Sequence, residues 1–571
     1  MSETVKTGHP KGLWYLFGTE MWERFGYYLM LGIFSLYMLD GWNNGGMGFA
    51  PAQKSDIYGT YLGLVYLTPF IGGLLADRIL GYRRSIVIGG LMMSAGYFLL
   101  SIHSVTTFYI ALLFIILGNG FFKPNISTLV GNLYSGEEMK DKKDAGYNIF
   151  YMGINIGAFI CNFVAAYMRI NYGWGHAFAA AGVGMLIGVV VFLLGTKHIK
   201  HVDVVKPVQA GDMSTGKILG LTVLPMFIFG VIGYMIPGNF LGSDTNDAFI
   251  IGCLPVIGFF IYLAFTAEAK ESRAIKALLA VFTCVILFFA IFHQNGDALT
   301  VWAEDHTDRS MPTSVSTVAD KVGMAQVVVN NDVVSADKVT FDSAIADMRA
   351  KENAMPSVTA ADLKAKGNYA NEIGTLEKSR SYFSTLPGDQ VPAKGTNLKL
   401  YSTELYQSIN PFWVVALTPI IVGIFGWMRR RKQEPSTPTK IFLGLVITAL
   451  SALVMVGAVF ATNDMSIKAS SWWLIASYGV ITIGELCLSP MGLSLVSKLS
   501  PPRITALMMG GFFLAISVGN KLSGMLSSLW ESMPAKQNFF YLNFGLVMAA
   551  AVVLFLMLKW LNGVMKENNV Q

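Results

Sequence analysis

The sequence predicts an all-α integral membrane protein with fourteen transmembrane helices and one small insert outside the membrane. Of its 571 residues, 53% are hydrophobic and 14% are charged, whereas roughly a quarter of the residues of a soluble protein are charged. The hydrophobic residues form blocks close to the ~20 residues that cross ~30 Å of hydrocarbon. Lys and Arg gather in alternate short loops between these blocks, as expected of cytoplasmic loops.

The hydrophobic blocks follow a six, two and six order. The first eight spans are predicted near residues 12–39, 56–78, 84–104, 107–133, 146–168, 175–196, 217–236 and 247–267. The last six are predicted near 274–297, 409–428, 439–461, 471–496, 503–529 and 538–562. This order indicates two six-helix bundles with two additional helices between them, although the sequence repeat itself is faint. Such paired halves usually hold a substrate near the middle of the membrane.

This order divides the chain into five parts. They are an N-terminal bundle (1–206), the two additional helices (207–270), the first helix of the second bundle (271–298), the insert (299–405) and the remaining helices (406–571). The insert is polar, with a Val-rich run at 327–329 and a helix-like piece at 342–352. It is predicted to be a small folded module, and whether it caps the protein or docks a partner stays open.

The first hydrophobic segment is predicted to remain in the protein. It is longer than the h-region of a signal peptide and carries Glu20, Glu23 and Arg24. Basic clusters follow spans two, four, six, eight and ten, which places both termini in the cytoplasm and the insert on the opposite side. We therefore expect a multi-pass protein of the plasma (bacterial inner) membrane, in contact with its lipid.

Charged residues inside the first span indicate a proton site. Glu20, Glu23, Arg24, Tyr27 and Tyr28 share one helix face. Each charge costs about 2.5–3.5 kcal/mol in the middle of a membrane, so these residues must face protein or water. Two carboxylates beside one guanidinium leave a negative charge that a proton can neutralise. The alternative is an ion-pair cluster that only joins helices.

Two further charges lie deep in spans of opposite halves. Lys123 lies midway along span four, next to Pro124, and Glu485 lies equally deep in span twelve. We hypothesise that they pair across a central cavity, and that protonation of Glu485 or substrate binding loosens the pair. The alternative is two separate polar patches.

Asp77, Arg78 and Arg83 lie at the cytoplasmic boundary of span two. There they can clamp neighbouring helix ends in one conformational state. The preference of cytoplasmic loops for positive charge would by itself explain the two arginines, but it would not explain Asp77.

Other classes of protein are not indicated. The net charge of +6 comes from short loops, not from one basic face, which argues against nucleic acid as a partner. The four cysteines (Cys161, Cys253, Cys284 and Cys487) lie inside apolar blocks, without the spacing of a disulfide framework or a metal site. No nucleophile–base pair or phosphate loop is recognisable, so we expect neither an enzyme nor a cofactor.

Several motifs resemble those of the proton-dependent oligopeptide transporter family of the major facilitator superfamily. Glu20–Tyr28 resembles its ExxERFxYY motif, and Phe150–Gly157 is similar to its FYxxINxG segment. The residues around Asp77 resemble the cytoplasmic loop motif of the superfamily. Lys123–Asn125, Ile409–Pro411 and Glu485–Pro490 also fall where the family has them. The resemblance covers nearly all the membrane part but not residues 299–405.

The resemblance implies a twelve-helix major facilitator fold plus two helices, and import of di- and tripeptides with protons by alternating access. Arg24 and Lys123 would hold the peptide carboxylate, and Glu485 its amino group. The implied lining residues are Tyr27, Tyr28, Tyr66, Asn155, Asn410 and Ser489. Glu20 and Glu23 would couple protons, together with Arg24, Lys123 and Glu485, and the proton gradient would be the driving force.

Three residues depart from the family pattern. Leu31 stands where many members have a second arginine, His293 where an acidic residue is common, and Phe512 where a tryptophan is common. His293, near the outer end of span nine, is also a candidate titrating gate. The alternative is a hydrogen-bonded histidine that faces a water-filled vestibule. Two alternatives stay open: a major facilitator transporter of another zwitterionic or anionic solute or drug, and a sensor that no longer transports.

Overall fold

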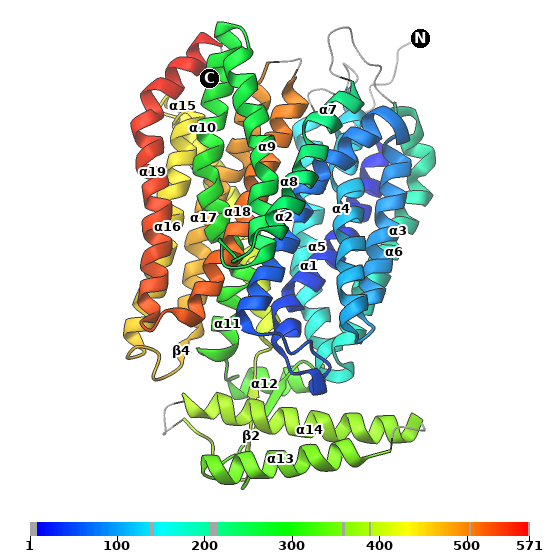
Figure 1. Ribbon diagram of the computed structural model, residues 1–571, viewed down its shortest axis with the longest axis vertical. Helices are drawn as coiled ribbons and strands as arrows, with labels where there is room; N and C mark the ends of the chain where they lie inside the picture. Colours follow the sequence, from blue (N-terminus) through cyan, green and yellow to red (C-terminus); the bar gives the residue numbers. More distant parts are fainter. Residues whose placement is uncertain are drawn as a thin grey trace.

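The computed structural model describes residues 8–135, 139, 142–204, 214–356, 360–386, 390–501 and 504–568. Two helical bundles stand side by side (Figure 1). The first half contains α1 (Lys11–Leu39), α2 (Pro51–Leu75), α3 (Tyr82–Leu100), α4 (Val105–Leu133), α5 (Lys143–Tyr172) and α6 (Trp174–Ile199). The second half contains α10 (Ala269–Phe292), α15 (Ile409–Arg430), α16 (Thr437–Ala461), α17 (Ser471–Leu499), α18 (Thr505–Ser532) and α19 (Lys536–Glu567).

The two additional helices lie between the halves (Figure 1). The first, predicted as one span near 217–236, is broken into α7 (Thr215–Leu221) and α8 (Val223–Met235). Pro225 causes the break, because it has no N–H to donate to the carbonyl of Leu221. The second additional helix is α9 (Asp244–Thr266).

The helices of the two halves pack in the same pattern. In the first half α4 packs against α2 and α3, and α6 packs against α1 and α3. In the second half α17 packs against α15 and α16, and α19 packs against α10 and α16. The predicted fold class, two six-helix bundles with two additional helices, is thereby confirmed.

Within the described residues, twelve helical segments meet the length and hydropathy of a membrane span. The charges of α1 and the two arginines at the start of α3 lower the hydropathy of those two helices.

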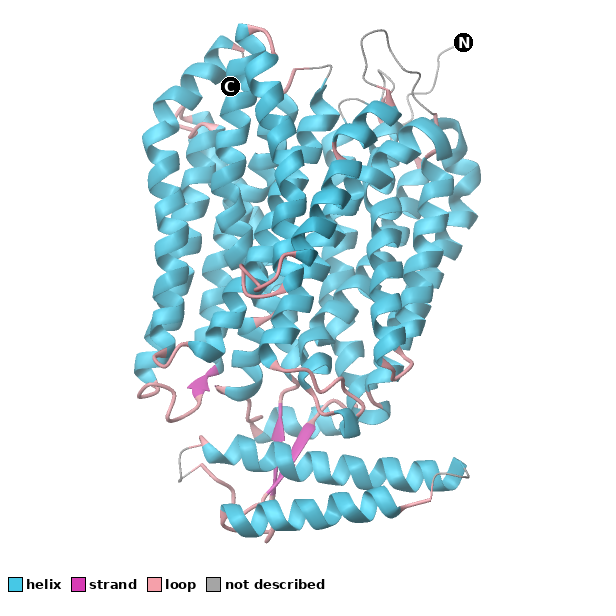
Figure 2. Cartoon of the chain, in the orientation of Figure 1, coloured by secondary structure: helices cyan, strands magenta, loops and turns pink. Residues whose placement is uncertain are grey.

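The insert is a compact module beyond one end of the bundles (Figure 1). It contains α12 (Thr313–Lys321), β2 (Gln326–Val329), α13 (Lys338–Ala354), α14 (Ala360–Ser384) and β3 (Asn397–Leu400). β2 pairs antiparallel with β3, and Val328, Tyr382, Leu386 and Leu400 form a small core beneath them. Figure 2 shows that the strands are confined to the insert and its junction with the membrane part.

The insert is shorter at both ends than the predicted range of 299–405. A 3-10 turn (His293–Gly296) and α11 (Ala298–Asp305) continue α10, and another 3-10 helix (Thr403–Ser408) leads into α15. Polar residues lower the hydropathy of these segments, although their backbone is still mostly helical. β1 (Thr307–Asp308) then pairs in parallel with β4 (Ala469–Ser470) of the second half.

The N- and C-termini lie at the end of the bundles opposite the insert (Figure 1). We call the two ends the insert end and the terminal end.

Glycines allow the tightest helix crossings. A Cβ on Gly118 of α4 would lie 2.6 Å from the carbonyl oxygen of Gly89 on α3. The equivalent helices of the second half cross at Gly444 and Gly484, where a Cβ on Gly444 would lie 2.8 Å from the Gly484 carbonyl oxygen. Small residues at these crossings let the backbones approach, which is a common basis of helix association in membranes.

We therefore expect Gly118→Leu to destabilise the protein by about 1–3 kcal/mol, the usual cost of overpacking. The measurement is the apparent Tm of the purified protein in detergent. Gly545→Leu on α19 is the matched control, because nothing lies within 4 Å of a Cβ at that position. Equal Tm values for the two variants would contradict close packing at Gly118.

Candidate functional site

The charged face of α1 forms a buried cluster. The Arg24 Nη2 donates to Glu23 Oε1 at 2.6 Å, and its Nε pairs with the second oxygen of Glu23. Glu20 Oε1 lies 3.4 Å from the same Nε. All three side chains are buried, and Glu20 Oε2 has no hydrogen-bond partner among the described residues. The cluster therefore holds two carboxylates for one guanidinium, and the unpartnered Glu20 oxygen is a place where a proton can bind.

Aromatic rings and α5 hold the guanidinium of Arg24 in place. It lies 4.8 Å from the ring centre of Tyr27 and 5.8 Å from that of Tyr28. On α5, a Cβ at Gly157 would lie 2.3 Å from the Met21 carbonyl oxygen and 3.3 Å from the Arg24 Cβ. Only glycine therefore allows α5 to pack against this face of α1.

Lys123 of α4 lies beside Tyr66 of α2. Its Nζ is 4.2 Å from the ring centre of Tyr66, and this ring meets the ring of His293 edge to face at 5.7 Å. Because His293 follows α10, this row of three side chains passes from the first half to the second.

Glu485 lies on α17 of the second half. Its Oε2 accepts a hydrogen bond of 3.1 Å from Asn410 Nδ2, which also donates to Thr482. In this conformation the hypothesised ion pair between Lys123 and Glu485 is not formed, and both residues belong to the described chain. The reason is that Lys123 lies over Tyr66 and the Asn410 amide holds Glu485.

Most of the predicted lining residues are partly exposed in the middle of the bundles. They are Tyr28, Tyr66, Lys123, Asn155, Asn410, Glu485 and Ser489. Tyr27 is different, since it is 2% exposed and packs beneath Arg24. It supports the guanidinium and does not line the accessible surface.

The two halves are joined at the insert end by buried ion pairs. Lys54 of α2 pairs with Asp297, and Lys521 of α18 lies 2.5 Å from Asp56 of α2. Hydrogen bonds reinforce this closure: Ser35 Oγ donates to the Gly296 carbonyl at 2.7 Å.

A third pair closes the same end. Arg169 of α5 makes two hydrogen bonds, of 2.8 and 2.9 Å, to the carboxylate of Glu404, just before α15. Together with the Lys54–Asp297 and Lys521–Asp56 pairs, this pair joins the two halves at the insert end.

None of these ion pairs was predicted from the sequence. Lys521 lies inside predicted span thirteen, where the cost of a buried charge would have identified it. Lys54 and Asp56 lie at the start of span two, and Asp297 at the end of span nine, where charges are ordinary. Their pairing becomes visible only when the halves are placed together.

The predicted gating residues lie at the terminal end. Asp77 and Arg78 belong to a π-helical turn (Ala76–Leu80) that follows α2. The Arg83 Nε lies 2.7 Å from Asp203 Oδ2, and Asp203 Oδ1 accepts a hydrogen bond from the backbone N–H of Tyr82. Arg83 therefore joins the start of α3 to the loop after α6, within the first half.

The three departing residues lie in different surroundings. His293 is not near the outer end of its span as predicted, because the helical segment continues from Ala269 to Asp305. Leu31 packs against the apolar core of the first half. Phe512 is 2% exposed and packs against Phe282, with ring centres 5.6 Å apart, in the core of the second half. Phe512 therefore does not line the accessible surface.

Known proteins are similar to this chain in sequence and in architecture. The chain matches the POT family over residues 83–328 and 392–542. It is 29% identical to a di-/tripeptide transporter of Lactococcus lactis, over 98% of this chain and 97% of that protein. It is 27% identical to dipeptide and tripeptide permease A of Escherichia coli, over 91% of this chain and 84% of that protein.

Solved structures agree with the sequence comparisons. A crystal structure of the peptide transporter POT in complex with sulfate has a TM-score of 0.73 and 27% identity, covering 98% of this chain and 97% of its own. A mutant peptide transporter POT in complex with alafosfalin has a TM-score of 0.73 and 26% identity, with the same coverage. These likenesses confirm the predicted fold.

The insert-end closure can be tested with Asp297→Asn. Breaking a buried pair costs about 3–5 kcal/mol because it leaves a buried charge uncompensated, here the charge of Lys54. We expect the insert end to open more often, so that the thiol of a Ser35→Cys variant reacts several-fold faster with a maleimide when Asp297→Asn is also present. The four native cysteines are buried.

Asp347→Asn is the matched control for this test. It also removes one carboxylate from an ion pair, but the Lys351–Asp347 pair lies on the surface, with both side chains more than 60% exposed. Equal reaction rates in the two backgrounds would show that the Lys54–Asp297 pair does not hold the halves together.

Proposed function

Because the chain belongs to the POT family, we propose that it is a symporter that imports di- and tripeptides together with protons. The observation that carries the proposal is the placement of opposite charges on the two halves. Arg24 and Lys123 lie on the first half and Glu485 lies on the second. A zwitterion held between them would couple the positions of the two halves.

The proposed peptide site uses the partly exposed residues of both halves. The peptide carboxylate binds Lys123 and Arg24, and the amino group binds Glu485. Tyr28, Tyr66, Asn155, Asn410 and Ser489 line the remaining surface. Contacts to the peptide backbone and termini leave the side chains free to vary, which suits a transporter of many peptides.

Glu20 and Glu23 are the proposed proton carriers. In the described state Arg24 is already shared between two carboxylates. Protonation of one of them releases part of the guanidinium for the peptide carboxylate. Loss of that proton restores the competition, which favours release of the peptide. Binding of the proton and binding of the peptide thus assist each other.

Alternating access supplies the transport step. The described conformation is joined at the insert end, with buried pairs such as Lys54–Asp297 between the halves. Import requires that these pairs separate so that the site faces the insert end, and that they form again once the peptide is bound.

We place the terminal end, with both termini, in the cytoplasm, because the basic loops lie there. The insert then lies outside, and the protein belongs in the plasma (bacterial inner) membrane. Protons, peptide and membrane lipid are its partners. Neither catalysis nor a cofactor enters the proposal.

Leu31 favours a second candidate, a transporter of another zwitterionic or anionic solute or drug. It is apolar and packs into the core, so Arg24 and Lys123 are the two cations left for a carboxylate. A solute with a weaker or differently placed anionic group would need fewer cations. Competition with dialanine separates the two candidates.

The central test is uptake of labelled dialanine into proteoliposomes, with and without an inward proton gradient. We expect accumulation that requires the gradient and is lost in Glu23→Gln, because the cluster then lacks one titratable carboxylate. Asp347→Asn in the insert serves as the control and should transport normally. No uptake by a folded, reconstituted protein would favour another solute.

The proposed topology can be tested separately with a membrane-impermeant maleimide on intact cells. We expect Lys394→Cys, on the exposed surface of the insert, to be labelled from outside. Lys432→Cys, in the loop between α15 and α16, should be labelled only after the cells are opened. The reverse pattern would invert the topology.

A further inference from the structure

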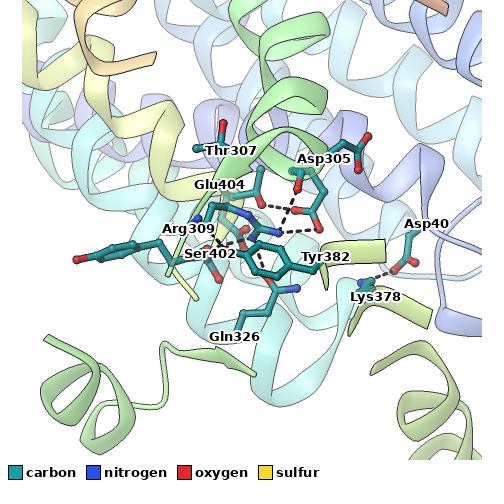
Figure 3. A network of polar contacts seen from close by, with 12 residues as sticks. Asp40, Asp305, Thr307, Arg309, Gln326, Lys378, Tyr382, Ser402 and Glu404 are labelled. Atoms are coloured by element: carbon teal, nitrogen blue, oxygen red, sulfur yellow. Dashed lines mark hydrogen bonds and ion pairs between the residues drawn. The ribbon is translucent and has the colours of Figure 1, made fainter. Parts of the chain in front are cut away.

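A cavity lies at the insert end, between the insert and both halves. Its volume is about 230 Å³, and its walls come from α1, α5, α6, α11, the insert and the loop before α17. Figure 3 shows the polar network around it, with Arg309 at the centre and Lys378 reaching toward Asp40. It is separate from the partly exposed residues described above, because the closed insert end lies between them.

We propose that this insert-side cavity binds a zwitterionic peptide before the insert end opens. The inference rests on the proposed function and extends it, since it gives the insert a role in collecting the substrate. The cavity would be a second site for the same class of solute.

The charges of the insert-side cavity match a zwitterion. Its walls carry the cations Arg169, Arg309, Lys378 and Lys468 and the carboxylates Asp40 and Glu304, among others. Separated charges of both signs around one cavity suit a molecule with a carboxylate at one end and an ammonium group at the other.

The Lys378–Asp40 contact is one that a peptide could enter. The Lys378 Nζ lies 3.5 Å from Asp40 Oδ2, whereas direct charge-assisted hydrogen bonds are about 2.7–2.9 Å long. The carboxylate of a peptide can bind Lys378, and the ammonium group of the peptide can bind Asp40. Two short contacts to the peptide would then replace the one long contact between Lys378 and Asp40. These two residues come from the insert and from α1, so the peptide would bridge the insert and the first half.

Arg309 and Lys468 offer further hydrogen-bond donors. Arg309 pairs with Glu304 at 3.2 Å and donates to Gln326 and to the Tyr401 carbonyl. Its buried Nε has no partner within the part of the chain that the structure describes. Lys468 donates to the Asp305 carbonyl, and burial together with the neighbouring Arg309 lowers its pKa to about 8. An anionic group beside Lys468 would stabilise its charged form.

The cavity also has apolar walls for peptide side chains. Leu36 and Leu39 of α1, Trp174 of α6 and Val301 of α11 contribute to them. The ring of Tyr382 forms part of the insert's contribution and is held by its hydroxyl, which donates to Asp308 at 2.9 Å. The rigid ring and the aliphatic side chains can accept small side chains of varied shape.

Arg169 connects this cavity with the closed insert end. It lines the cavity and also makes the two hydrogen bonds to Glu404 that join the halves. A carboxylate in the cavity competes with Glu404 for this guanidinium. Binding there would therefore weaken one of the contacts that must separate before the peptide can move inward.

The test measures protection of a single cysteine in the cavity. Ser381→Cys lines the cavity and is exposed to reagent, and it is placed in a Lys123→Gln/Glu485→Gln background that lacks the proposed central contacts. We expect dialanine to slow alkylation of this cysteine by maleimide several-fold in a saturable way. N-acetyl-dialanine amide, which carries no charge, should not.

Two lysine variants provide the matched comparison. Lys378→Gln should abolish the protection, because it removes the cation that faces Asp40. Lys351→Gln removes an exposed lysine elsewhere on the insert and should leave the protection unchanged. No protection by dialanine, or equal protection by the uncharged compound, would overturn the proposal.

The result can be distinguished from failure of the proposed function. If the unmodified protein takes up dialanine but the cysteine is not protected, the central transport site stands and the insert-side cavity is not a peptide site. If the unmodified protein takes up no dialanine, it is the proposed function that fails.

Discussion

The buried charges of α1 constrain much of the surrounding structure. Arg24 and its two carboxylates would each cost about 2.5–3.5 kcal/mol in the middle of a membrane if they faced lipid. They are instead covered by tyrosine rings and by α5, which approaches closely because Gly157 has no side chain. The protein thus keeps two carboxylates and one guanidinium together inside the membrane part, away from lipid.

The cost of an uncompensated buried charge also acts between the two halves. Lys54–Asp297 and Arg169–Glu404 join residues from opposite bundles in buried surroundings. Such pairs are favourable while the halves touch, but each charge can be hydrated again once the halves separate. The conformations that are closed and open at the insert end can then differ by only a modest free energy, as alternation between two states requires.

The insert is attached unequally to the two halves. β1 pairs with β4, and Ser471 donates to the Asp308 carbonyl, so the insert is fastened to the second half. Its contacts with the first half include a hydrogen bond from Asn171 to the Gly323 carbonyl and the long Lys378–Asp40 pair. An opening at the insert end would therefore break the weaker attachment and leave the module on the second half.

The sequence by itself determined the spans and the charged face of α1, because block length and helical spacing are local properties. Hydropathy could not follow α10 through its polar turn to Asp305. The family pattern identified Phe512 only as a departure, and its place in the core became visible in the structure. Only the tertiary structure decided which charges meet. Lys54 and Asp297 are 243 positions apart, and Arg169 and Glu404 are 235 apart. Lys123 rests on Tyr66 and not on Glu485, since such contacts depend on how two separately formed bundles pack.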